Sequence, residues 1–146
     1  VKSSAVAVDG ETIGKIGKGY NVLLGVFPDD TKKDAEILAV KIAKLRIFED
    51  EDEKMNMSIL DVDGEVLAIS QFTLCADIKK GNRPSFTLSA APDEANRLYE
   101  LFCSELSANG VGNVEKGIFG ADMAVDIAND GPVTIVLDTD IWRKDK

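Results

Sequence analysis

The sequence predicts a layered α/β fold of mostly antiparallel β-sheets with two amphipathic helices. The 146 residues include about seven or eight strand-like stretches, several of them separated by residues typical of tight turns. Two further stretches carry apolar residues at the 3.6-residue period of a helix. No repeat, linker or low-complexity segment divides the chain, so we expect residues 1–146 to form a single domain.

The first part of the chain predicts three strands and a helix. Residues 1–8 alternate up to an Asp-Gly turn, residues 12–16 follow it, and residues 20–27 are nearly all apolar. Thr31 is a suitable N-cap, because Asp34 stands three residues later. The helix that follows has one apolar stripe: Ala35, Leu38, Ala39, Ile42 and Leu45.

The middle of the chain predicts a loop and then a β-hairpin. Residues 49–53 are all acidic, which is typical of a solvated loop. A Mg²⁺ site is the less favoured alternative there, because no convergent spacing of carboxylates is visible. Residues 58–62 and 65–72 flank an Asp-Gly pair, the strongest hairpin signal in the chain. We expect strand character to continue to Asp77.

The last part predicts a second helix and a β-rich tail. Pro92 suits the first helical position, and Asn109 with Gly110 marks the end of the helix. We expect residues 114–127 and 133–137 to supply the closing strands. The apolar stripe of this helix is typical of a core: Ala95, Leu98, Tyr99, Phe102 and Leu106.

Composition excludes several classes of enzyme. The chain contains no histidine, which removes Ser-His-Asp triads, HExxH zinc sites and imidazole bases. The two cysteines, Cys75 and Cys103, lie among apolar residues, and we favour buried thiols over reactive ones because no histidine can activate them. We therefore expect no metal and no cofactor.

Charge and hydropathy limit the partners. A net charge of −9 disfavours a long contact with DNA or duplex RNA. Lys79, Lys80 and Arg83 nevertheless place three cations in one short turn, which suits either a small contact with an RNA end or an ordinary charged turn. No apolar run is long enough to span a membrane, and we expect a cytosolic protein that does not bind membranes.

Two short segments carry the most specific signal. Residues 70–74 end a predicted strand, and residues 129–134 connect the last two predicted strands. In this order they resemble the two signature motifs of the D-aminoacyl-tRNA deacylases, and residues 83–86, 91–92 and 117–123 match that family as well. The motif residues are Ser70, Gln71, Phe72, Thr73 and Leu74 in the first segment, and Asn129, Asp130, Gly131, Pro132, Val133 and Thr134 in the second.

The resemblance implies a deacylase-like α/β/β fold and a homodimer. Each active site of the family pairs residues 70–73 of one subunit with Gly131 and Pro132 of the other. The family also implies that the peptide bond between Gly131 and Pro132 is cis. The implied activity is hydrolysis of the ester bond of D-aminoacyl-tRNA, which releases free tRNA and the D-amino acid. A wall of main-chain carbonyls would reject L-residues, and glycyl-tRNA mischarged on a non-cognate tRNA would pass.

The resemblance also assigns roles within the site. Gln71, Phe72 and Thr73 would be the catalytic residues: main-chain N–H groups of the first motif would hold the carbonyl oxygen, and the ribose 2′-OH of the tRNA would assist the attack of water. Phe119, with Ala95 and Met123, would hold the terminal adenine, although plain core packing explains these three as well. Thr73 has no base near it in sequence, so we favour a positioning role over that of a nucleophile.

Two other functions stay open at the level of sequence. One is a non-catalytic module that binds the 3′ end of RNA, because a fold does not fix a function. The other is an editing relative that acts on an L-aminoacyl-tRNA.

Overall fold

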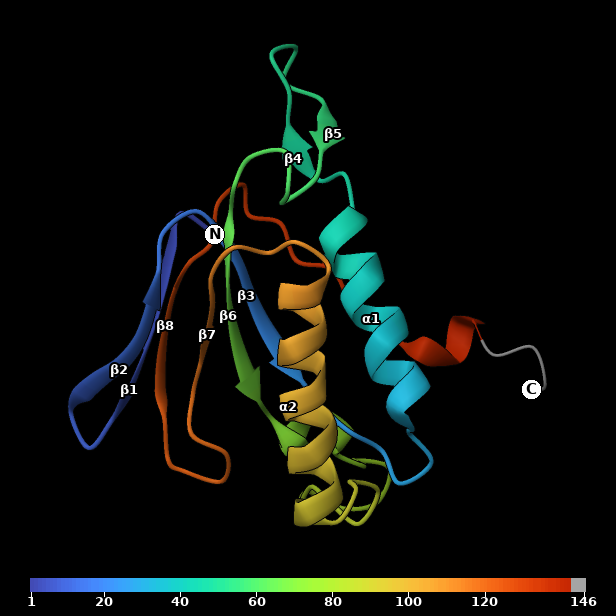
Figure 1. Ribbon diagram of the computed structural model, residues 1–146. Coiled ribbons are helices and arrows are strands. Elements are labelled where there is room, and N and C mark those ends of the chain that lie inside the picture. The colour runs from blue at the N-terminus through green and yellow to red at the C-terminus, as the bar shows by residue number, and fades with distance from the viewer. Residues whose placement is uncertain (143–146) are drawn as a thin grey trace.

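The protein is built in three layers (Figure 1), and the computed structural model describes residues 1–142. One outer layer is the antiparallel sheet β2–β1–β8, the middle layer is the parallel sheet β3–β6–β7, and helices α1 and α2 cover the far face of the middle sheet. The predicted layered α/β fold with two helices is confirmed. The strands are β1 (Ser3–Val8), β2 (Glu11–Ile16), β3 (Gly19–Leu24), β6 (Glu65–Ser70), β7 (Val114–Lys116) and β8 (Ala124–Ala128), and the helices are α1 (Lys32–Lys44) and α2 (Pro92–Ala108).

The middle strand β6 explains the layering. Its side chains alternate between two hydrophobic clusters, because successive residues of a strand point to opposite faces. Val66 and Ala68 belong to the cluster under the helices, whereas Leu67 and Ile69 belong to the cluster against the outer sheet. All four are at most 2% exposed. A strand that is buried on both faces has no polar face, which is why residues 65–70 are mostly apolar.

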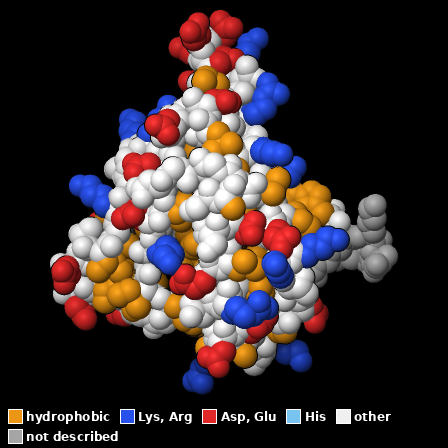
Figure 2. All heavy atoms as spheres, viewed as in Figure 1, with side chains coloured by type: hydrophobic (Ala, Val, Ile, Leu, Met, Phe, Trp, Pro, Cys, Tyr) orange, Lys and Arg blue, Asp and Glu red, His pale blue; other side chains and the backbone are white. Residues whose placement is uncertain are grey.

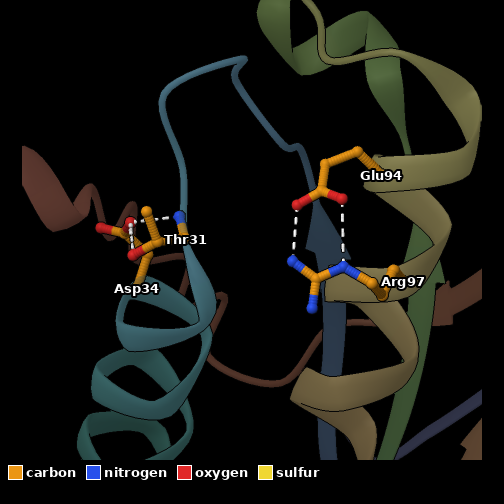
Figure 3. A network of polar contacts seen from close by, with 4 residues as sticks. All are labelled: Thr31, Asp34, Glu94 and Arg97. Carbon is orange, nitrogen blue, oxygen red and sulfur yellow. Dashed lines mark hydrogen bonds and ion pairs between the residues drawn. The ribbon is translucent and has the colours of Figure 1, made fainter.

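Both predicted helices are confirmed, and local chemistry fixes where each begins. Thr31 caps α1 in a capping box, in which the Thr31 N–H donates to Asp34 Oδ2 at 2.7 Å (Figure 3). Pro92 stands at the start of α2, where its missing N–H costs no helical bond. The two helices lie side by side with their N-termini at the same end of the molecule (Figure 1).

The predicted hairpin around Asp63 and Gly64 is wrong. Residues 59–63 form turns and no strand. Ser58 and Asp61 cap these turns reciprocally, since the Ser58 N–H donates to Asp61 Oδ2 at 2.9 Å and the Asp61 N–H donates to Ser58 Oγ at 3.2 Å. Ile59 is fully buried and packs in the hydrophobic core under the helices. Local side-chain bonds of this kind compete with sheet formation.

Three other boundaries differ from the predictions. The strand predicted to reach Asp77 stops at Ser70 and is followed by the short 3₁₀ helix η1 (Phe72–Cys75). Residues 133–137 are not a strand, and a second 3₁₀ helix, η2 (Thr139–Trp142), follows them. The acidic loop caps a small hairpin of strands β4 (Phe48–Glu49) and β5 (Met55–Met57), which periodicity could not indicate because both strands are so short.

No helix within residues 1–142 has the length and apolar character needed to cross a bilayer.

Candidate active site

The first motif lies where the middle sheet ends. Ser70 is the last residue of β6, and the chain then turns into η1. The Gln71 N–H donates to Leu24 O at 2.8 Å and the Leu74 N–H donates to Gln71 O at 3.2 Å. The first N–H groups of a helix have no partner inside it. Within residues 1–142 the N–H groups of Phe72 and Thr73 find no acceptor, so both are available to a ligand.

The side chains of this motif are open to solvent. Phe72 is 57% exposed, and its ring packs edge-on against Phe86 with 5.1 Å between the ring centroids. The Gln71 Nε2 donates to the exposed Thr73 Oγ1 at 3.1 Å. No titratable side chain of the described chain forms a hydrogen bond with Thr73. A threonine hydroxyl is a weak nucleophile without a base, so this geometry fits a positioning role.

Gly25 supports the motif from behind, and sequence reasoning missed it. A Cβ at this position would lie 3.0 Å from Leu74 Cβ, 3.3 Å from Cys75 Sγ and 3.5 Å from Gln71 O. Glycine therefore lets the chain that leaves β3 pack directly on η1. Nothing in the sequence indicates this role, because the two segments are about 50 residues apart and only the parallel pairing of β3 with β6 brings them together.

Three further predicted site residues lie at the same end of the molecule. Ala95 stands in the first turn of α2 and is 8% exposed, and Phe119 packs on the same cluster, with its ring 6.5 Å from that of Tyr99. Met123 lies on the other face of the middle sheet, in the cluster with Ile69. Ala95 and Phe119 thus pack in one hydrophobic cluster, and Met123 packs in the other.

Tyr99 is a second residue that sequence reasoning assigned only to the core. Its buried hydroxyl donates to Ala68 O at 2.7 Å, two residues before Ser70. Burial raises the pKa of Tyr99 well above its usual range, so the hydroxyl remains a donor at all physiological pH values. Tyr99 therefore connects α2, the end of β6 and the ring of Phe119.

The second motif lies in an exposed turn after β8. The Gly131–Pro132 peptide bond is cis, as the resemblance implies, and Gly131 has φ +122°. The Asn129 Nδ2 donates to Thr134 Oγ1 at 3.1 Å, which closes the turn across the Gly-Pro pair. Gly131, Pro132 and Thr134 are exposed, and Val133 is half-buried.

The two motifs lie at opposite ends of the middle sheet. Ala128 pairs with Ser3, Val1 is hydrogen-bonded to Gly19, and Gly19 pairs with Glu65, so the second motif sits near the beginning of β6. The first motif follows the end of β6. A strand rises about 3.3 Å per residue, so the six residues of β6 alone separate the motifs by about 17 Å. They cannot meet within one chain of this shape.

Both cysteines are buried, as predicted. Burial raises the pKa of Cys103 to about 11 and that of Cys75 in the same direction. Both thiols stay protonated near pH 7, and the thiolate is the reactive form. Among residues 1–142, no group of three or more His, Cys, Asp or Glu side chains is placed to hold a metal ion.

Comparisons with known proteins give matches over most of the chain. The family described as D-Tyr-tRNA(Tyr) deacylase matches residues 1–138. Similar relatives named D-aminoacyl-tRNA deacylase include that of Sulfurihydrogenibium sp. (strain YO3AOP1), which is 58% identical over 95% of this chain and 93% of the relative. Another, from Bacillus licheniformis, is 55% identical over 95% of this chain and 94% of the relative.

Solved structures extend the likeness to the fold. One, titled "c-Myc DNA Unwinding Element Binding Protein", has a TM-score of 0.88 and 43% identity over 94% of this chain and 93% of that chain. Another, titled as a probable eukaryotic D-amino acid tRNA deacylase, has a TM-score of 0.76 at 18% identity over 90% of this chain and 91% of that chain, and it supports the fold alone.

The matches span almost the whole chain, and they define a class of protein, the deacylases of aminoacyl-tRNA. The chain belongs to the D-Tyr-tRNA(Tyr) deacylase family. The family and the enzyme class predicted from the sequence, a hydrolase, are thereby confirmed.

Proposed function

We propose that this protein hydrolyses the ester bond of D-aminoacyl-tRNA and releases free tRNA and the D-amino acid. The family membership supports the reaction, and the observation that carries it is the pair of unpartnered N–H groups at Phe72 and Thr73. Two adjacent main-chain donors are the usual construction of an oxyanion hole. Glycyl-tRNA mischarged on a non-cognate tRNA is a second substrate in this proposal.

The chemistry rests on positioning. An aminoacyl ester is already activated, so a donor pair that holds its carbonyl oxygen and an oriented water are sufficient catalysts. The ribose 2′-OH beside the ester assists the water. Thr73, held by the Gln71 amide, positions the ester and forms no covalent intermediate. This division of roles fits a site that contains no histidine.

The terminal adenosine would sit on the α2 side of the same end. Phe119 offers a half-buried aromatic ring, and Ala95 presents a small side chain at the start of α2. Stacking on an aromatic ring is the usual way to hold an unpaired base. Ser70, at the end of β6, and Met123, in the loop before β8, complete the substrate-binding set that we propose.

The protein would act as a homodimer. The two motifs are separated within one chain, so a site that uses both must combine two subunits. Residues 133–138 also pair with no strand of the described chain, and they expose Val136 (91%) and Ile135 (45%). Unpaired extended backbone with exposed apolar side chains is typical of a surface that a partner covers.

Chiral selection would come from the second motif of the partner subunit. Main-chain carbonyls of Gly131 and Pro132 would face the α-carbon of the substrate. An L-residue would drive its side chain into these carbonyls, whereas a D-residue would point its side chain away. Glycine has no side chain and would not be rejected. Asn129, Val133 and Thr134 would hold the turn in shape, and the Asn129 to Thr134 hydrogen bond supports that role.

Deacylation of matched D-, L- and glycyl-tRNAs tests the proposal. We expect rapid release of the D-residue and of glycine and retention of the L-residue. Selective release of the L-residue would instead indicate an editing enzyme for L-aminoacyl-tRNA. No release of any residue, together with binding of the tRNA 3′ end, would indicate a non-catalytic RNA module.

A further inference from the structure

A loop of ten residues, 77–86, leaves the site and returns to it, and we call it the basic loop because Lys79, Lys80 and Arg83 lie on it. Its base is closed by two hydrogen bonds between Asp77 and Ser85, from N–H to carbonyl in both directions, at 2.7 and 2.9 Å. Residues 78–84 are exposed. Gly81 has φ +62°, and a Cβ there would meet nothing within 4 Å, so there is open space around this position of the loop.

The three cations of the basic loop are uncompensated. Within residues 1–142 none of them forms an ion pair, although the chain as a whole carries a net charge of −9. Two carboxylates, one at the start of the loop and one in the first turn of α2, have other partners. Asp77 Oδ1 accepts the Lys79 N–H at 3.0 Å, and Glu94 forms two hydrogen bonds with Arg97 (Figure 3).

The pairing of Glu94 with Arg97 also affects the pKa of the carboxylate. The hydrogen bond from the Arg97 side chain lowers the pKa of Glu94, so this carboxylate is committed to a neighbour on its own helix. The cationic residues of the basic loop are themselves exposed to solvent. Figure 2 shows Lys and Arg side chains, with Asp and Glu side chains among them, at the lower edge of the molecule, where Figure 1 places this loop.

The basic loop is attached to the first motif at both ends. Asp77 follows the last residue of η1 by two positions, and Phe86 packs against Phe72 at 5.1 Å. Fully extended chain spans at most about 3.6 Å per residue, so Lys79 lies within about 22 Å of Thr73. That is the length of a few nucleotides, so the loop is within reach of the next phosphates of an RNA whose terminal ester lies at Thr73.

We propose that the basic loop binds the phosphate backbone of the tRNA just inside its acylated terminal adenosine. This inference rests on the proposed function and adds the surface that receives the RNA. Three cations on a loop are suited to phosphates, which are read as charges, whereas an acidic peptide would have no reason to dock beside an adenosine site. Because the rest of the chain is acidic, the loop also sets the direction from which tRNA approaches.

The test compares two variants that lose the same charge. The first replaces Lys79, Lys80 and Arg83 by Gln. The matched control replaces Lys15, Lys44 and Lys54 by Gln; these exposed lysines lie on β2, at the end of α1 and beside the acidic turn. Binding of uncharged tRNA is followed by fluorescence anisotropy in a salt series. Deacylation is compared for D-aminoacyl-tRNA and for 3′-D-aminoacyl-adenosine, which has no phosphate.

The basic-loop variant should bind tRNA about 100-fold more weakly at 0.1 M salt, and the slope of log K against log salt should fall by about 2, as expected when three contacts with single-stranded phosphates are lost. Its kcat/KM for D-aminoacyl-tRNA, divided by its kcat/KM for 3′-D-aminoacyl-adenosine, should fall by a similar factor. The fall should come from a higher KM for the tRNA substrate. The control should bind tRNA and discriminate between the two substrates as the unaltered protein does.

Equal behaviour of the two variants would overturn the proposal, as would equal competition by a duplex DNA, which would make the loop a general polyanion site. Failure of the unaltered protein to deacylate any substrate would sink the proposed function, while the binding experiment would still decide the role of the loop.

Discussion

The two ends of the middle sheet carry the two motifs, and they are built differently. At the carboxyl end, residues 70–75 follow a strand that is buried on both faces, and they rest on Gly25 and on the core. At the amino end, residues 129–138 are mostly exposed and pair with no strand of the described chain. One hydrogen bond, from Asn129 to Thr134, holds the turn together.

This difference suggests that the first motif is preorganised within one chain, whereas the second motif needs assembly with a partner to act. The first motif has its N–H groups fixed by the chain's own fold, as a catalytic donor pair requires. The second motif is an exposed turn, and in our proposal it becomes part of a site only against a partner subunit. Catalytic power should therefore depend on the carboxyl end, and selectivity should depend on the amino end and on dimerisation.

The largest effect should come from removing one donor at the carboxyl end. Phe72→Pro deletes the Phe72 N–H, and the position tolerates proline because it opens a helix and follows an extended residue, Gln71 at φ −140° and ψ 91°. We expect kcat for D-aminoacyl-tRNA to fall about 10²–10³-fold, the usual cost of one oxyanion donor.

Phe72→Ala is the matched control, because it removes the same ring but keeps the N–H. It should retain most of the activity, and both variants should melt within a few degrees of each other. Equal activity of the Pro and Ala variants would mean that the N–H of Phe72 does not bind the oxyanion.

The second prediction joins the two ends. Phe72→Pro disables the first motif, and Gly131→Val should disable the second, because a Cβ at Gly131 already lies 2.8 Å from Val133 Cγ2. Each variant alone should be nearly inactive. After subunit exchange, half of the dimers are mixed and each has one intact site, so activity should recover to about one quarter of the unaltered protein. Mixed dimers without any recovery would place both motifs of a site in the same chain.

The third prediction concerns the amino end alone. Gly131→Ala adds a methyl group at φ +122°, where side chains are strained by roughly 1–3 kcal/mol. We expect hydrolysis of D-residues to fall about 10-fold and the melting temperature to fall by a few degrees. Gly10→Ala is the control, since Gly10 also has a positive φ (+80°) but lies in the distant β1–β2 turn. A similar loss of activity in both variants would mean that Gly131→Ala acts by lowering stability and not through the site.

The same two ends show what the sequence can and cannot predict. The helix starts at Thr31 and Pro92 depend on residues within four positions of each other, and local patterns captured them. The first hairpin was captured in the same way, because Asp9 and Gly10 both adopt positive φ in its turn. The fold class followed from these elements, since two amphipathic helices must cover a sheet.

Features that depend on tertiary contacts could not be predicted from the sequence. Asp63 and Gly64 carry the residue types of a hairpin, but burial of Ile59 and the Ser58–Asp61 bonds favour a compact turn. Gly25 acts on the first motif only through the pairing of β3 with β6. The site residues themselves came from the family resemblance, because periodicity alone cannot distinguish Ala95 or Phe119 from core.

The smallest effect should come from Thr73, the residue of the carboxyl end that looks most like a nucleophile. Its hydroxyl accepts one hydrogen bond, from Gln71 at 3.1 Å, and no base of the described chain contacts it. A net hydrogen bond is worth about 0.5–1.5 kcal/mol, so Thr73→Ala should reduce kcat about 2–10-fold. Loss of a true nucleophile costs about 10⁶ in triad enzymes. Thr73→Ser, which keeps the hydroxyl, should restore most of the rate if the hydrogen bond is what matters. Two results would contradict this: a loss of kcat of about 10⁴-fold or more in Thr73→Ala, or an acyl group found on Thr73 by mass spectrometry after rapid quenching. Either would show that the carboxyl end reacts through a side chain. Catalysis could then no longer be assigned to main-chain groups with selectivity supplied by the partner subunit.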